Sequence, residues 1–408
     1  MKRKILILST ALLIVVGGGY LKLKDTNKEG ELVSAETLKE KSLVGIYIEE
    51  DNNYTKVDQI PESGYTFNSE MSICKIGDEL QDMTITYDMN TKTLSIAPMT
   101  MKGTKCYLYF DEEPTLKDTI LANSKVNEGT PNFANVATKG EGIYKTQDDW
   151  GDSYYFRGDV KNNWLKFAGY YWRIIRINGD GSIRVIYNGK STAMDGNDTV
   201  ISSSQVFNSN KNQSEYVGYM YTEGEQHGNI TNSSIKGVLD SWYSSNLASY
   251  ADKISTEAGF CGDRNLESGS WSSTGSKLYA AYGRLADNKA PTLKCSNSSD
   301  LYTTSSSSKG NKKLTNPIGL ITADEVSMAG GVFGSNNNSY YLYNKEDYWT
   351  MSPSNFRSNL ALVFYVRSYG DLNGTNVNNP IGIRPVINIA SNVAIKSGNS
   401  TSSEPYEI

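Results

Sequence analysis

Residues 360–389 carry the sequence pattern that most constrains the fold of this chain. Apolar side chains recur at every second position in two runs. They are Leu360, Leu362, Phe364 and Val366 in the first run, and Ile381, Ile383, Ile387 and Ile389 in the second. A period of two is typical of a strand with one buried face. Because a Gly/Asn-rich turn region, 370–374, lies between the runs, we expect two neighbouring strands of one antiparallel core.

Two short motifs accompany this pattern. Tyr348-Trp349-Thr350-Met351-Ser352-Pro353 precedes the first run, and Gly382-Ile383-Arg384-Pro385-Val386 lies within the second. In this order they resemble the closing segment of a C-type-lectin-like domain in a poorly characterised family of Gram-positive surface proteins. More distantly, they are similar to formylglycine-generating enzymes and to the variable ligand-binding proteins of diversity-generating retroelements. The resemblance covers about the last 230 residues, back to Trp164, and it implies a fold more strongly than a function.

The resemblance implies that Trp349 and the Gly-x-Arg-Pro strand are core, and that exposed positions between them meet the ligand. We expect an α+β fold class, in which a C-terminal C-type-lectin-like domain follows a small all-β sandwich and an N-terminal membrane helix. The expected boundaries are a signal anchor at 1–24, a spacer at 25–41, the sandwich at 42–113, a linker with a short helix at 114–139, the lectin-like domain at 140–395 and a disordered tail at 396–408.

The amino terminus has the charge pattern of a membrane-inserted segment. Lys2, Arg3 and Lys4 precede an apolar run over residues 5–16. Basic residues stay on the cytoplasmic side, so the rest of the chain is expected outside the cell, as a single-pass membrane protein. We favour an uncleaved anchor because no small-residue cleavage site lies at the usual distance. A removed signal peptide is the alternative.

Four cysteines favour two disulfides within the expected domains. Cys74, Cys106, Cys261 and Cys295 allow three pairings, and spacing favours Cys74 with Cys106 and Cys261 with Cys295. Each bond would close a loop of about 30 residues and stabilise the fold by about 3 to 4 kcal/mol. Such bonds suit an extracellular chain.

Composition excludes one class of partner. Lys and Arg number 40 against 45 Asp and Glu, so no basic surface for nucleic acid is expected. Tyrosine is abundant, at 28 residues. Tyrosine combines apolar area with a hydroxyl, which is typical of surface domains with polar loops.

The candidate binding residues lie around the first of the two strands. If Leu362, Phe364 and Val366 point inward, then Val363 and the side chains at 365, 367 and 369 point outward. We predict ligand binding by Arg357, Tyr365, Arg367, Tyr369, Asp371, Asn373 and Asn376. The alternative is a solvated strand face, or one covered by a loop. Arg384 is assigned to the structure.

No catalytic constellation is recognisable, so an enzyme is not expected. The single histidine, His227, stands in a Gly/Glu-rich loop without a nucleophile pattern and is interpreted as an isolated exposed residue. An oxidase of the formylglycine-generating type would need a reactive cysteine pair. Cys261 and Cys295 lie well before the closing strands, where a structural disulfide is the simpler interpretation.

Calcium remains open as a ligand, and no other cofactor is expected. Asp and Asn oxygens are the ligands that calcium prefers. They occur in two groups, Asp195, Asn197 and Asp198, and Asp371, Asn373 and Asn376. Turn chemistry explains these residues equally well.

These observations predict a membrane-anchored extracellular binding or adhesion protein, whose lectin-like domain holds a glycan, a peptide or a host protein. The alternatives are an envelope-structural protein without a soluble ligand and a formylglycine-generating-enzyme-like oxidase.

Overall fold

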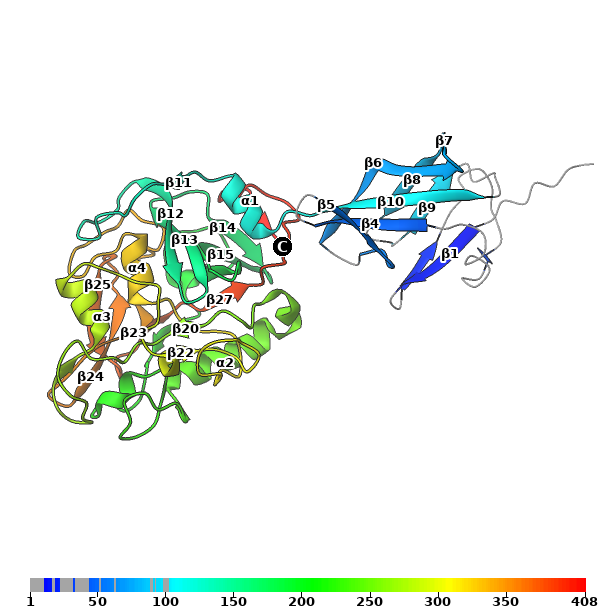
Figure 1. Cartoon of the computed structure of the whole chain (residues 1–408). Coiled ribbons are helices and arrows are strands. Elements are labelled where there is room, and N and C mark those ends of the chain that lie inside the picture. Colours follow the sequence, from blue (N-terminus) through cyan, green and yellow to red (C-terminus); the bar gives the residue numbers. More distant parts are fainter. Residues whose placement is uncertain are drawn as a thin grey trace, which may run out of the picture. The chain divides into compact units, whose positions relative to one another are not determined.

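The computed structural model describes residues 11–16, 19–22, 32–33, 44–50, 53–61, 64–88, 91, 93–97 and 103–408. The chain forms two compact units, Met1–Pro114 and Thr115–Ile408, each described by itself (Figure 1). Of the described residues, strands hold 40% and helices 14%. The protein is therefore mostly β.

The predicted α+β class with an N-terminal membrane helix is wrong. Most of the expected anchor, 1–24, lies outside the described residues, as does the expected spacer, 25–41, apart from 32–33. The described parts of the anchor segment are the antiparallel strands β1 (Ala11–Val16) and β2 (Gly19–Lys22). Apolar and β-branched residues such as those of β1 favour a strand as readily as a helix. Each helix that the structure describes falls short of the length and apolar character of a bilayer span.

The first unit contains the sheet β2-β1-β3, in which β3 is Leu32–Val33, and two further sheets around one small core. Its five-stranded sheet has the order β5-β4-β10-β6-β7. The bounds are β4 (Val44–Glu50), β5 (Asn53–Val57), β6 (Tyr65–Ile76), β7 (Glu79–Gln81) and β10 (Thr104–Glu112). β8 (Thr84–Asp88) and β9 (Thr93–Ala97) pair separately. Ile46, Ile85, Leu94 and Leu108 bring both sheets into the same core.

The second unit contains a large sheet, most of whose strands come from residues 126–187. Its members are β11 (Val126–Asn127), β12 (Gly140–Asp148), β13 (Gly151–Gly158), β14 (Trp164–Phe167), β15 (Tyr170–Ile177), β16 (Ile183–Tyr187), β27 (Val386–Ile389) and β28 (Tyr406–Glu407). β15 and β16 form the antiparallel hairpin that the Asn178-Gly179 turn predicts. β27 then pairs with β16, so the end of the chain closes onto this sheet.

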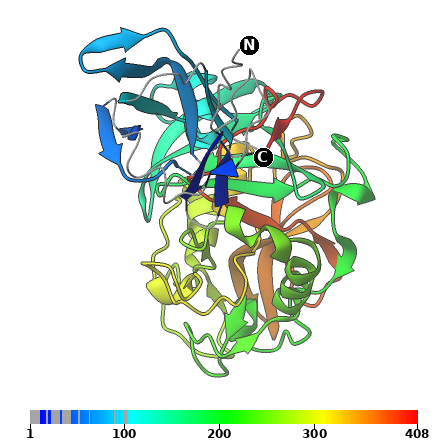
Figure 2. The ribbon, with the colours of Figure 1, turned by 90° about the vertical axis from the view of Figure 1, so that its right-hand side faces the viewer.

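A second sheet of this unit carries the predicted binding residues. Its members are β17 (Ser202–Gln205), β21 (Lys277–Leu278), β23 (Tyr348–Arg357), β24 (Leu360–Val366), β25 (Leu372–Asn376) and β26 (Ile381–Ile383). The orange ribbons of β23 and β24 run side by side in Figure 2. The α-helices of the unit are α1 (Leu116–Ala122), α2 (Ser234–Asn246), α3 (Ala280–Tyr282) and α4 (Ala323–Ala329).

The two runs that defined the sequence pattern are not neighbouring strands. β24 pairs with β23 and β25, whereas the second run splits into β26 and β27, which belong to different sheets. Pro385 lies between them and has no N–H to extend a ladder. Arg384 is fully buried beside it and donates to the carbonyl oxygens of Tyr187 and Leu342 at 3.0 and 2.9 Å. The segment therefore crosses from one sheet to the other at this point.

Two segments expected outside the packed domain belong to it. The tail, 396–408, is not disordered, because β28 pairs with β14 and Tyr406 is buried. The helix expected within the linker is α1, whose Leu116 and Ile120 are buried in the core of the second unit. Burial of the apolar side chains in these two segments stabilises the fold. This gain exceeds the conformational entropy that the segments lose when they become ordered.

Helix ends follow local sequence chemistry. The side chain of Ser233 accepts a hydrogen bond from Lys236 N at the start of α2. Thr322 and Glu325 form a reciprocal capping box at the start of α4. Serine and threonine are the residues expected at these N-cap positions.

Both predicted disulfides are confirmed. Cys74 and Cys106 join β6 to β10 in the first unit, and Cys261 and Cys295 close a 34-residue separation in the second. Among the described residues no cysteine is free. Each bond therefore restrains only the unit that contains it.

Replacing both Cys261 and Cys295 by serine should lower the free energy of unfolding of the second unit by about 3 to 4 kcal/mol, because the cross-link restricts the unfolded chain. All six tryptophans follow residue 149, so tryptophan fluorescence during guanidinium chloride unfolding reports on this unit. The matched Cys74/Cys106 double variant should leave that transition in place. Equal midpoints for all three proteins would contradict this prediction.

Candidate functional site

The predicted binding face of β24 is only partly open. Tyr365 shares this face with its cross-strand neighbours, Trp349 on β23 and Asn373 on β25. Val363 was predicted to point outward, but it is fully buried. Segment 205–217 packs on this face of the sheet: the Phe207 ring lies 5.6 Å from the ring of Trp349, whose Nε1 donates to Gln205 O at 2.8 Å. Tyr365 is half-buried.

The turn after β24 holds Arg367, Tyr369 and Asp371 together. Nη1 of Arg367 donates to Oδ2 of Asp371 at 3.2 Å, and the guanidinium carbon lies 5.2 Å from the centre of the Tyr369 ring. Gly370 closes the turn with a φ of +79°, and a Cβ there would lie 1.8 Å from the carbonyl oxygen of Asn337. Only glycine fits this position. The turn therefore fixes the arginine relative to the tyrosine.

We call Tyr365, Arg367, Tyr369 and Asn373 the Arg367 patch. The Arg367 side chain is 34% exposed and Tyr369 is 56% exposed, while Tyr365 and Asn373 are half-buried. Together these residues offer aromatic area, guanidinium donors and an amide to a ligand. A cation over an aromatic face adds a favourable contact that helps to hold this arrangement.

Asp371 supports the Arg367 patch from beneath and does not belong to its surface. It is fully buried, so the prediction that it contacts a ligand is wrong. Burial raises the pKa of the Asp371 carboxyl, although the nearby Arg367 charge opposes this shift. The carboxylate orients the guanidinium, and burial strengthens that interaction by excluding water.

Arg357 and Asn376 lie away from the Arg367 patch. Arg357 is exposed and pairs with Leu360 at the hairpin end of β24, and Asn376 pairs with Leu362. The patch begins at Tyr365 and its cross-strand partner Asn373, toward the opposite end of the strand. Leu362 and Tyr365 are three positions apart on β24, a distance of about 10 Å. The structure thus brings together the predicted residues from 365 to 373 and leaves these two apart.

Two of the residues considered for calcium form ion pairs with other side chains. Asp195 forms an ion pair with Lys345. Asp371 is paired with Arg367, and Asn376 is at the other end of β25. Among the described residues, no three His, Cys, Asp or Glu side chains group so as to hold a metal ion.

His227 is not the isolated residue that the sequence suggested. Its Nδ1 lies 2.8 Å from Oδ2 of Asp300, whose side chain is fully buried. The same carboxylate accepts hydrogen bonds from the Arg264 backbone N–H at 2.7 Å and from its Nε at 2.8 Å. These contacts join the histidine loop to the segment after Cys261, which is a structural role.

A network of buried ion pairs joins the β15–β16 hairpin to α4. Nε of Arg176 lies 2.9 Å from Oε1 of Glu325, and Nε of Arg184 lies 2.5 Å from the same oxygen. Nη1 of Arg176 also lies 2.6 Å from Oδ2 of Asp148. All four side chains are less than 10% exposed. Glu325 therefore serves both as a helix cap and as the counter-ion of two arginines on neighbouring strands.

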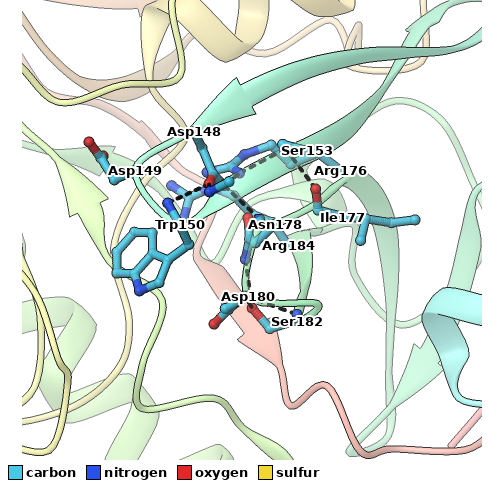
Figure 3. Close-up of polar contacts among 12 residues, drawn as sticks. Asp148, Asp149, Trp150, Ser153, Arg176, Ile177, Asn178, Asp180, Ser182 and Arg184 are labelled. Carbon is cyan, nitrogen blue, oxygen red and sulfur yellow. Dashed lines mark hydrogen bonds and ion pairs between the residues drawn. The ribbon is translucent and has the colours of Figure 1, made fainter. Parts of the chain in front are cut away.

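Asp148 connects two turns to this network (Figure 3). Its carboxylate accepts backbone N–H bonds from Trp150 at 2.8 Å and Gly179 at 2.9 Å. A Cβ at Gly179 would lie 2.4 Å from Oδ1 of Asp148, so glycine permits the close approach. Figure 3 shows the Trp150 ring turned away from the arginines.

A narrow pocket borders the network and is lined by Asp149, Trp150, Asp263, Arg284 and Asp324 among others. Arg284 lies 2.8 Å from Asp263 and 3.0 Å from Asp324. Asp149 accepts the Cys295 backbone N–H at 3.0 Å, and burial raises the pKa of its carboxyl. Because these charges have internal partners, the pocket fits a structural network better than a ligand site.

Sequence reasoning missed the buried arginines. Arg173, Arg176 and Arg184 lie in strands whose other residues are mostly apolar, and each is buried. The available signal was a charged residue within a strand that offers no polar face, together with a glutamate three residues after Thr322, which is the spacing of a capping box. The pairing itself requires the tertiary fold.

No family model matches this chain, and neither a curated protein nor a solved structure matches it. The geometry of the described residues is therefore the basis for inferring function.

Glu325→Gln should destabilise the second unit by about 3 to 5 kcal/mol, because it leaves Arg184 buried without a counter-charge and removes one of the two carboxylates that pair with Arg176. Guanidinium chloride unfolding, followed by tryptophan fluorescence, measures the loss. The matched control is Glu407→Gln, which removes an ion pair with Lys166 whose partners are both more than 40% exposed. That control should change stability by less than about 0.5 kcal/mol. Similar small losses in both variants would show that the network contributes little.

The stabilisation by Glu325 should depend on pH. Burial alone would raise the pKa of this carboxyl, but Arg184 and Arg176 outweigh it and hold the pKa below its ordinary value of 4.5. A lower pKa in the folded state means that the contribution is complete above this value and is lost as pH falls through the folded-state pKa. The stability difference between the wild-type chain and Glu325→Gln should therefore shrink between pH 7 and pH 3. A difference that stays constant would contradict the assignment.

Proposed function

We propose that this chain is an extracellular binding protein that holds a glycan, a peptide or a host protein at the Arg367 patch. The observation that carries the proposal is the fixed contact between Arg367 and Tyr369, both accessible to solvent, over a buried carboxylate. Arginine and tyrosine are enriched among the residues that contribute most to binding.

The fixed conformation of the Arg367 patch supports this proposal. The Gly370 turn and the Asp371 carboxylate hold the Arg367 side chain before a ligand arrives. A side chain that is already positioned loses less conformational entropy on binding. The guanidinium retains exposed area for a carboxylate, a hydroxyl or a carbonyl oxygen of the ligand.

The extracellular location rests on two features. Two disulfides are typical of chains outside the cytosol. The basic residues 2–4 before an apolar run have the charge pattern of a chain that is directed across the membrane, which would place residues 44–408 outside the cell.

The double variant Arg367→Lys/Tyr369→Ala should lower affinity for the ligand by about 30-fold or more. Lysine keeps the charge opposite Asp371 but lacks the planar fork of arginine. Arrays of glycans, peptides and extracellular proteins probed with the full chain identify the ligand, and titration of each variant then gives the affinity.

The matched controls carry the same residue types elsewhere. Arg357→Lys changes an exposed arginine outside the patch, and Tyr250→Ala removes a tyrosine that is 39% exposed. Both should bind as the wild-type chain does. Undiminished retention by the double variant, or failure of the wild-type chain to retain any arrayed molecule, would refute the proposed function.

A further inference from the structure

A second concave surface of this unit lies apart from the Arg367 patch. It is an open cleft of about 310 Å³, which we call the aromatic cleft. Its lining residues are Tyr170, Tyr187, Lys190, Asn197, Asp198, Val200, Ile201 and Trp242. This volume is at the lower end for small-molecule sites and suits one or two rings of a ligand.

Three aromatic rings form a continuous wall in the cleft. The ring centre of Trp242 lies 5.6 Å from those of both Tyr170 and Tyr187, and the two tyrosine rings are 5.4 Å apart. Trp172 is fully buried and packs edge-on against Tyr187 at 5.7 Å. The hydroxyl of Tyr170 donates to Asn246 Oδ1 at 2.6 Å. The half-buried Tyr170 and Trp242 are thus held from behind.

A polar rim faces this wall. Lys190, Asn197 and Asp198 line the cleft and are exposed. Gly189 has a φ of +98°, and a Cβ there would lie 2.4 Å from the carbonyl oxygen of Asp198, so the two rim segments are in close contact. Just beyond them, the Thr199 hydroxyl donates to Gly196 O and accepts a bond of 2.9 Å from Asn344 Nδ2. The rim is therefore ordered without a ligand.

We infer that the aromatic cleft binds a neutral pyranose ring of a glycan. A pyranose has an apolar C–H face, which suits the wall formed by Tyr170 and Trp242. Its edge carries hydroxyl groups, which can donate to the Asp198 carboxylate and accept from Lys190 or Asn197. The inference assigns a site distinct from the Arg367 patch and does not depend on it.

The arrangement disfavours other small ligands. The rim carries one cationic and one anionic side chain, so it favours neither a positively nor a negatively charged ligand. The three rings contact one another, so they leave no space between them for a quaternary ammonium group. Burial raises the pKa of Tyr187 to about 12, so its hydroxyl stays neutral at physiological pH.

Saturation-transfer NMR tests this site with the purified full chain and four neutral disaccharides: cellobiose, maltose, lactose and N,N′-diacetylchitobiose. At least one should receive saturation at its ring C–H protons. Trp242→Ala should abolish the signal, and Asp198→Asn should weaken affinity by about tenfold, because a charged acceptor is lost. Asp198 is exposed, so its replacement tests binding without disturbing the core.

The controls separate this site from the rest of the protein. Trp271→Ala removes a half-buried tryptophan that does not line the cleft, and Arg367→Lys/Tyr369→Ala alters the other patch. Both should retain the disaccharide signal. No signal from any of the four sugars, a signal unchanged in both Trp242→Ala and Asp198→Asn, or a signal from tetramethylammonium chloride alone would overturn the inference.

Discussion

The carboxylate of Glu325 is the interaction on which the second unit depends. It caps α4 through Thr322 N and lies against Arg176 and Arg184 from adjacent strands. A buried charge is tolerated only where its partners are in place. The helix, the hairpin and the Asp148 turn must therefore form together, and this requirement favours one arrangement of the sheet over its alternatives.

Local chemistry predicted much of the fold. The caps at Ser233 and Thr322, the β15–β16 hairpin and both disulfides follow from neighbouring residues or from cysteine spacing. Long-range packing determined what could not be predicted. Val363 is buried because segment 205–217 covers it, and the 381–389 run divides at Pro385 between two sheets. Neither contact leaves a signal in the strand's own alternation of apolar residues.

The Arg367 patch and the aromatic cleft differ in how well the sequence alone predicts them. The Arg367 patch comes from one strand, its turn and the next strand, so a short stretch contains nearly all of it. The aromatic cleft combines β15, β16 and α2 with the 3-10 helix at Asn197–Thr199. In the sequence, Trp242 fits the apolar face of a helix, and only the fold shows that one side of its ring remains accessible.

The start and end of the second unit meet. Leu116 N donates to Val393 O at 2.8 Å, and Asn123 of the segment after α1 donates to the hydroxyl of Tyr406 at 3.3 Å (Figure 1). Ends that lie this close can be joined by a short linker, and new ends can be opened in an exposed loop such as 268–275. Circular permutation would thus preserve the packing of this unit while moving its point of attachment, because its architecture does not depend on where the polypeptide begins.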